Sequence, residues 1–169
     1  MNNTDLIKMM ARYKNWSNGI TYEAVMSLPE GEALRPRKTN FSNMVRTLNH
    51  IYVVDKIFQA HIQKRDHGYK ARNTDTTPDL ADLWADQQVI DQWYVDLAYQ
   101  LDEEGLSEVI DFPFIDGGRG QMTVGEIILH QVNHGTYHRG FVADMMNQIG
   151  VVPNASDITV FTQVERGKQ

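Results

Sequence analysis

Hydrophobic residues recur at intervals of three and four along four long stretches of the chain, which is the spacing typical of amphipathic helices. Counting their capping residues, the predicted helices span residues 4–28, 42–63, 77–105 and 123–150. Polar segments rich in helix breakers separate them, and a final turn or two is expected within residues 156–164. Four long helices with medium loops predict an all-α protein, a four-helix bundle of the up-and-down or crossover type.

Helix boundaries are predicted by capping residues. Thr123 and Glu126 have capping-box spacing at the start of the fourth helix, and Gly150 is expected to end it. Thr4 is the expected N-cap of the first helix, and Thr77 precedes a proline at the first position of the third.

Residues 108–122 interrupt the helical pattern just before the last long helix. The stretch 109–115 favours an extended backbone, and the glycine-rich stretch 116–120 favours a turn. Pro113 argues against a central strand, because proline cannot donate a ladder hydrogen bond. We therefore expect a short irregular hairpin or loop at this place.

Length, composition and charge narrow the classes of function. A chain of 169 residues with 41% hydrophobic content predicts one domain over residues 1–169. The absence of cysteine excludes disulfides and thiolate metal ligands from this chain. The net charge of −6 argues against a nucleic-acid partner. The lack of a long apolar run or signal-peptide core predicts no membrane partner and a cytoplasmic location.

Three of the six histidines lie four residues apart in the fourth helix: His130, His134 and His138. On a helix this spacing places them along one flank. A helical projection puts His138 near the middle of the apolar stripe, His134 beside it and His130 at the edge. Inward imidazoles need partners for their ring nitrogens, and a bound cation would satisfy them, although satisfied core histidines are the alternative.

The second helix carries apolar residues on both sides and places His50 toward the interior. Asp55 falls among the apolar positions, where a carboxylate is costly unless paired. It is expected either to orient a ligand or to hold a positive group, unless it lies on the helix surface. His134 and His138 have metallopeptidase spacing, but Gly135 stands where that motif carries its general-base glutamate. This departure argues against a metallopeptidase, and the remaining interpretation is a metal site with three imidazole nitrogens as ligands.

Two segments resemble the signature segments of the DinB family of bacterial metal-binding four-helix proteins: residues 47–51 followed by Asp55, and residues 129–140. The opening residues 12–16 and the closing residues 150–153 with Asp157 are similar to that family as well. The resemblance thus covers nearly the whole chain.

This resemblance implies a bundle in which His50, His134 and His138 hold one divalent ion, with His130 outside the coordination shell. Zn²⁺ or Ni²⁺ with an open coordination position is expected for such a nitrogen site. Relatives with the same bundle use their ion with a low-molecular-weight thiol. The resemblance therefore implies a hydrolase or a thiol S-transferase acting on a small-molecule substrate, and a homodimer.

Four residues are candidates for orienting the ligand rings through their second nitrogens: Asn49, Asp55, Asn133 and Tyr137. A surface or capping contact is the alternative for each. The competing hypothesis from another class is a non-catalytic dimeric bundle that binds a metal or ligand and has a stress or scaffold role.

Overall fold

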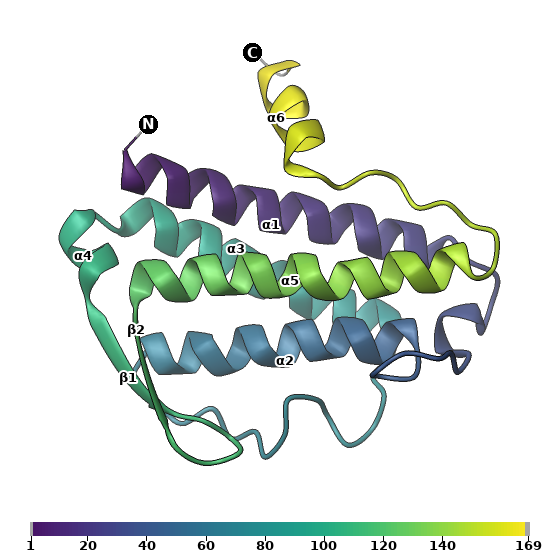
Figure 1. The fold of residues 1–169 in the computed structure, drawn as a ribbon, viewed down its shortest axis with the longest axis horizontal. Helices are drawn as coiled ribbons and strands as arrows, with labels where there is room; N and C mark the ends of the chain where they lie inside the picture. Colours follow the sequence, from purple (N-terminus) through teal and green to yellow (C-terminus); the bar gives the residue numbers. More distant parts are fainter. Residues whose placement is uncertain (1, 168–169) are drawn as a thin grey trace.

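The computed structural model describes residues 2–167, which form a bundle of four long helices with a β-hairpin before the last of them (Figure 1). The long helices are α1 (Asn3–Met26), α2 (Met44–Ile62), α3 (Leu80–Gln100) and α5 (Val124–Asn147). The smaller elements are η1 (Glu32–Leu34), α4 (Glu103–Ser107), β1 (Val109–Pro113), β2 (Arg119–Thr123) and α6 (Ile158–Gly167). The predicted fold class is confirmed. Among the described helices, none is both long and apolar enough to cross a lipid bilayer.

Side-chain caps explain where the long helices begin. Thr123 accepts a hydrogen bond from the backbone N–H of Glu126, whose carboxylate accepts one from the N–H of Thr123, so the predicted capping box is present. Asn2, Asn43 and Asp79 cap α1, α2 and α3. The predicted N-caps Thr4 and Thr77 were wrong by two residues each, because Asn2 accepts a hydrogen bond from the N–H of Asp5 and Asp79 accepts from those of Ala81 and Asp82.

The prediction that the third helix continues to Gly105 was wrong. Helix α3 ends at Gln100, and the backbone of Leu101 is extended. Asp102 then accepts a hydrogen bond from the N–H of Gly105 and caps the separate short helix α4. A new N-cap thus breaks a helix that hydrophobic periodicity alone would continue.

The bundle has the crossover arrangement. Helices α1 and α5 run in one direction and α2 and α3 in the other, as the colours of Figure 1 show. Helix α1 packs against α3 and α5, and α2 packs against α5 and α3. Because α2 and α3 are sequential and parallel, residues 63–79 must return along the length of the bundle (Figure 1). This crossover loop covers the outer side of α2.

Two apolar core clusters lie toward opposite ends of the bundle, and a polar layer separates them. One cluster joins the start of α1 to the end of α3, and the other joins the end of α1 to the start of α2. The second cluster includes the stacked rings of Tyr22 and Trp84, whose centroids are 4.6 Å apart. The polar layer between the clusters contains buried charges that must be paired.

Lys14 is the centre of this polar layer. Its Nζ atom donates to Asp55 Oδ2 at 2.7 Å and also to Asp91 Oδ1, and all three side chains are almost fully buried. Asn18 Nδ2 donates to Asp91 Oδ2 at 2.8 Å, and Arg139 Nη1 donates to Asn18 Oδ1 at 2.8 Å. Burial raises the pKa of Asp55 to about 6, although the charge of Lys14 opposes this shift. Asp55 therefore holds a positive group, which was one of its predicted alternatives.

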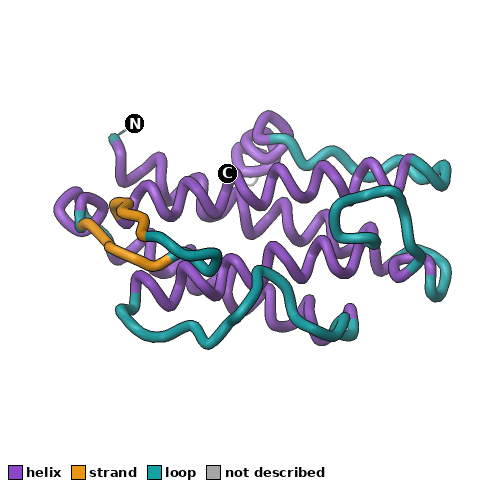
Figure 2. The backbone as a smooth tube through the Cα atoms, turned by 60° about the horizontal axis from the view of Figure 1, so that its bottom comes forward, coloured by secondary structure: helices purple, strands orange, loops and turns teal. Residues whose placement is uncertain are grey.

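The hairpin is more regular than expected. Strands β1 and β2 pair antiparallel, with Phe112 opposite Gly120 and Pro113 opposite Arg119 at the end of the ladder. A Cβ atom at Gly120 would lie 2.6 Å from the ring of Phe112, so glycine is needed for this pairing. Figure 2 shows the hairpin and the crossover loop on the same face of the bundle.

We expect Lys14→Met to lower the free energy of unfolding by about 3–5 kcal/mol, because it leaves two buried carboxylates without their cation. Urea denaturation followed by circular dichroism measures this loss. Lys70→Met, at an exposed loop position, is the matched control and should change stability by less than about 0.5 kcal/mol. Equal stability of the two variants would show that Lys14 contributes no net pairing energy.

Candidate metal centre

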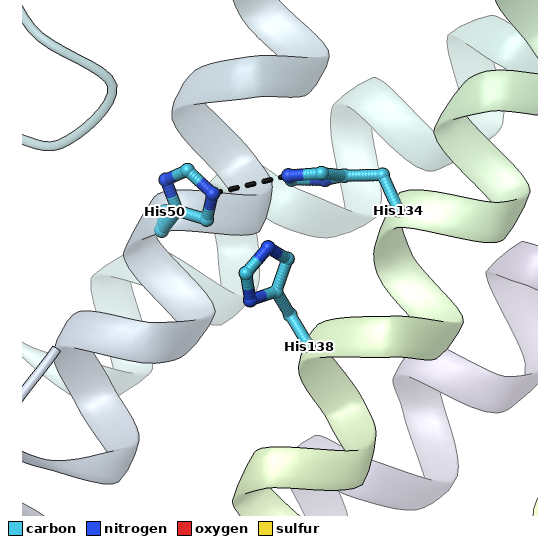
Figure 3. A group of neighbouring side chains, drawn as sticks. All are labelled: His50, His134 and His138. Atoms are coloured by element: carbon cyan, nitrogen blue, oxygen red, sulfur yellow. Dashed lines mark hydrogen bonds between the residues drawn. The ribbon is translucent and has the colours of Figure 1, made fainter. Parts of the chain in front are cut away.

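Three histidines from two helices converge beside the polar layer. His50 comes from α2, and His134 and His138 come from successive turns of α5. Their rings point toward one another (Figure 3). The Nε2 atoms of His50 and His134 are 3.0 Å apart, and one nitrogen from each of the three rings lies within 4.8 Å of the other two. These are the three histidines that the family resemblance implied.

Helix geometry explains why α5 supplies two of the rings. Residues four apart on a helix lie one above the other, so His134 and His138 share the flank that packs against α2. Gly135, between them, is buried, and a Cβ atom there would lie 2.8 Å from Arg139 Nη1. A side chain at position 135 would therefore require the guanidinium of Arg139 to shift.

The crossover loop orients the His50 ring. The Nδ1 atom of His50 is 2.6 Å from the backbone carbonyl oxygen of Arg72, which can only accept a hydrogen bond. Nδ1 therefore carries the proton, and Nε2 presents its lone pair to the other two rings. Asn49 holds this part of the loop, because its amide donates to Asn73 Oδ1 and to Thr74 Oγ1.

All three rings are held in the neutral form. Burial, followed by the charges of the neighbouring histidines, lowers the pKa of His134 to about 2. Burial, followed by the charge of His50, lowers the pKa of His138 to about 4. The pKa of His50 is also lowered, again mainly by burial. Neutral imidazoles are the form that binds a metal ion.

The arrangement of these nitrogens fits a cation. The Nδ1 atoms of His134 and His138 have no hydrogen-bond partner within residues 2–167. With the His50 proton on Nδ1, two Nε2 atoms face each other at 3.0 Å, and their lone pairs would repel unless a proton or a metal ion lies between them. The three-histidine group could therefore hold a metal ion.

The four residues predicted to orient the ligand rings do not hydrogen-bond to them. Asp55 pairs with Lys14, and Asn49 holds the crossover loop instead. Asn133 is exposed, and Tyr137 is 63% exposed with its ring beside that of His138. The ring partner that sequence reasoning missed is a backbone carbonyl, that of Arg72, which no side-chain pattern reveals.

A cavity of about 400 Å³ opens from the three histidines between α2, α5 and the hairpin. His130 lies on its wall, with its ring centroid 5.7 Å from that of His134 and 5.0 Å from that of Phe58. It is not a member of the three-histidine group, in agreement with its predicted place at the edge of the stripe. The centre thus faces a space that a small molecule can enter.

The fold and this centre define the class: a four-helix bundle with a three-histidine cluster shared by two facing helices. The DinB family model matches residues 1–168, and the chain belongs to the DinB family. It is 21% identical over 170 residues to Protein DinB of Bacillus subtilis (strain 168), covering 94% of each chain. A crystal structure of a DinB-like protein from Bacillus cereus ATCC 10987 has a TM-score of 0.64 at 16% identity, covering 85% of this chain and 91% of that one.

The metal-free protein should lose stability as the pH falls below about 6.5. The folded-state pKa values of His134 and His138 are lower than the ordinary value near 6.5, so the unfolded chain binds more protons in this range. We expect a loss of roughly 2 kcal/mol between pH 7 and pH 5, measured by urea denaturation with a chelator present.

Asp55 contributes with the opposite sign, because its folded-state pKa is raised. Comparison with His134→Gln removes this background, since Asp55 is unchanged in the variant. The variant should lose less stability over the same pH interval. An equal loss in both proteins would contradict the depressed pKa of His134.

Proposed function

We propose that this protein is a divalent-metal-dependent enzyme in which His50, His134 and His138 bind one ion, Zn²⁺ or Ni²⁺, and leave a coordination position open. The observation that carries the proposal is the convergence of three neutral imidazoles at the inner end of a cavity. A structural site closed by protein ligands would not need an adjoining cavity. Three nitrogen donors suit the borderline-soft ions Zn²⁺ and Ni²⁺.

In the proposed site, neighbouring residues hold the three ligand rings in the orientation that would bind the ion. The Arg72 carbonyl fixes the tautomer of His50, and α5 fixes the separation of His134 and His138. Phe41 stacks on His50 with 4.3 Å between ring centroids and also lies against His138, so it shields this side of the centre from water. Rings held in this way would accept an ion without rearrangement of the helices.

The reaction that we propose is hydrolysis or S-transfer with a low-molecular-weight thiol. A bound divalent ion of this kind supplies Lewis-acid activation of a water molecule or a thiol near neutral pH. Because the chain contains no cysteine, the sulfur of an S-transfer reaction would belong to a small-molecule substrate. Membership of the DinB family supports the metal site, and the open cavity would give a small substrate access to it.

His138→Ala should reduce the metal content of the purified protein severalfold, because two imidazoles bind a divalent ion much less tightly than three. Elemental analysis after purification without a histidine tag measures the content. His130→Ala is the matched control, since His130 lies on the same flank of α5 two turns earlier but outside the group. Metal content that is unchanged in His138→Ala, or equally reduced in His130→Ala, would remove the proposed ligand assignment.

Cobalt substitution separates the two reaction types. The Co²⁺-loaded protein, titrated with 2-mercaptoethanol, should show a sulfur-to-cobalt charge-transfer band if a thiol reaches the open position. The same titration of His138→Ala is the control. No band at millimolar thiol would count against S-transfer. Failure of azide and acetate as well to change the cobalt spectrum would favour the non-catalytic bundle.

A further inference from the structure

Aromatic rings form a continuous wall on the side of the cavity away from the three histidines. The ring centroids of Phe58 and Phe112 are 5.2 Å apart, and those of Phe112 and Phe114 are 5.4 Å apart. His61 stacks on Phe112 at 5.0 Å. Val54 and Ile57 of α2 complete the lining next to these rings. Rings and aliphatic groups thus make up most of the surface that a ligand would contact.

Charge is nearly absent from this lining. Among the described residues that line the cavity, Arg72 alone carries a permanent charge, and its guanidinium donates to Asp116 at the hairpin turn. The side chains of Arg72 and Asp116 are 47% and 68% exposed, so solvent screens this ion pair. Burial and the neighbouring His67 lower the pKa of His61, so this imidazole is neutral at pH 7. A charged group that lay against the aromatic wall would lose its hydration and find no unpaired counter-ion within reach of the wall.

We propose that the substrate of this centre is a small molecule whose uncharged apolar part, preferably an aromatic ring, lies against the wall of Phe58, Phe112 and Phe114 while its polar reacting group faces the three histidines. This inference rests on the proposed function, because it assigns the substrate class of the same site. It excludes ligands that would have to place a charged group against the aromatic wall.

Size and access agree with this class. A cavity of about 400 Å³ is at the small end of ligand sites and accommodates one ring with a short substituent. Phe114 is 47% exposed on the hairpin and offers an apolar surface at the entrance. Arg72 of the crossover loop and residues 112–115 of the hairpin line the cavity.

The test is a hydroxamate series bound to the Zn²⁺-loaded protein and measured by isothermal titration calorimetry. The affinity of acetohydroxamate measures binding to the metal alone. Benzohydroxamate carries the same metal-binding group and an aromatic ring in addition. Pentanohydroxamate and glutaric monohydroxamate have chains of the same length. The far end of the first is a methyl group, and the far end of the second is a carboxylate. Benzohydroxamate should bind about 10- to 100-fold more tightly than acetohydroxamate, as expected for burial of an apolar ring. Glutaric monohydroxamate should bind at least about tenfold more weakly than pentanohydroxamate.

Two variants locate the effect. Phe114→Ala removes an exposed ring and should weaken benzohydroxamate about three- to tenfold while leaving acetohydroxamate unchanged. Tyr99→Ala removes an exposed ring on α3, which is not part of the cavity lining, and should change neither affinity. If Phe114→Ala lost affinity for both acetohydroxamate and benzohydroxamate, Phe114 would be needed for the metal site itself. That result would overturn its assigned role in contacting the apolar part of the substrate.

The outcomes distinguish this inference from the proposed function. If acetohydroxamate binds and benzohydroxamate or the carboxylate analogue binds no differently, the substrate class is wrong while the open metal site stands. If the protein takes up no metal, the proposed function fails. The cavity is then tested in the metal-free protein with benzamide and acetamide by amide-proton NMR. Shifts at residues 54–58, 112 and 114 with benzamide alone would support the apolar wall, and equal shifts with both would overturn it.

Discussion

The approach of two ring nitrogens across the interface of α2 and α5 is the constraint on which the candidate centre depends. Nε2 of His50 and Nε2 of His134 lie 3.0 Å apart in a buried setting, with the pKa of each ring lowered. In the metal-free protein, His134 Nε2–H can donate a hydrogen bond to His50 Nε2, and a bound cation would take the place of that proton. The packing of α2 against α5 holds the two rings at this separation. The bundle therefore brings together two ring nitrogens from residues 84 positions apart in the sequence.

The polar layer explains how this geometry is maintained. Lys14 joins α1 to α2 and α3 through Asp55 and Asp91, and Arg139 adds α5 to the same network through Asn18. Asp55 follows His50 by little more than one helical turn, and Arg139 is the residue after His138. Because these charges are buried, sliding one helix along another would leave a charge without its partner. Register along α2 and α5 is what brings the three histidines to one level.

Much of the fold could be predicted from the sequence, because hydrophobic spacing and capping residues act locally. The capping box at Thr123, the four long helices and the place of the hairpin were all predicted correctly. The end of α3 was wrong, since a new N-cap at Asp102 competes with continued periodicity. For the site, spacing placed His134 and His138 on one flank, but the convergence with His50 required the family resemblance. The Arg72 carbonyl and the aromatic wall depend on tertiary packing, which no local pattern encodes.

The contact between His50 and the crossover loop has a consequence for sequence variation. The acceptor at Arg72 belongs to the main chain, so any amino acid at that place can orient the imidazole provided the loop keeps its path. The side chain of the same residue reaches Asp116 of the hairpin. The backbone of residue 72 thus orients His50, while its side chain has the separate role of contacting the hairpin. Substitutions at position 72 can therefore change the side chain that lines the cavity without changing the hydrogen bond that orients the His50 ring.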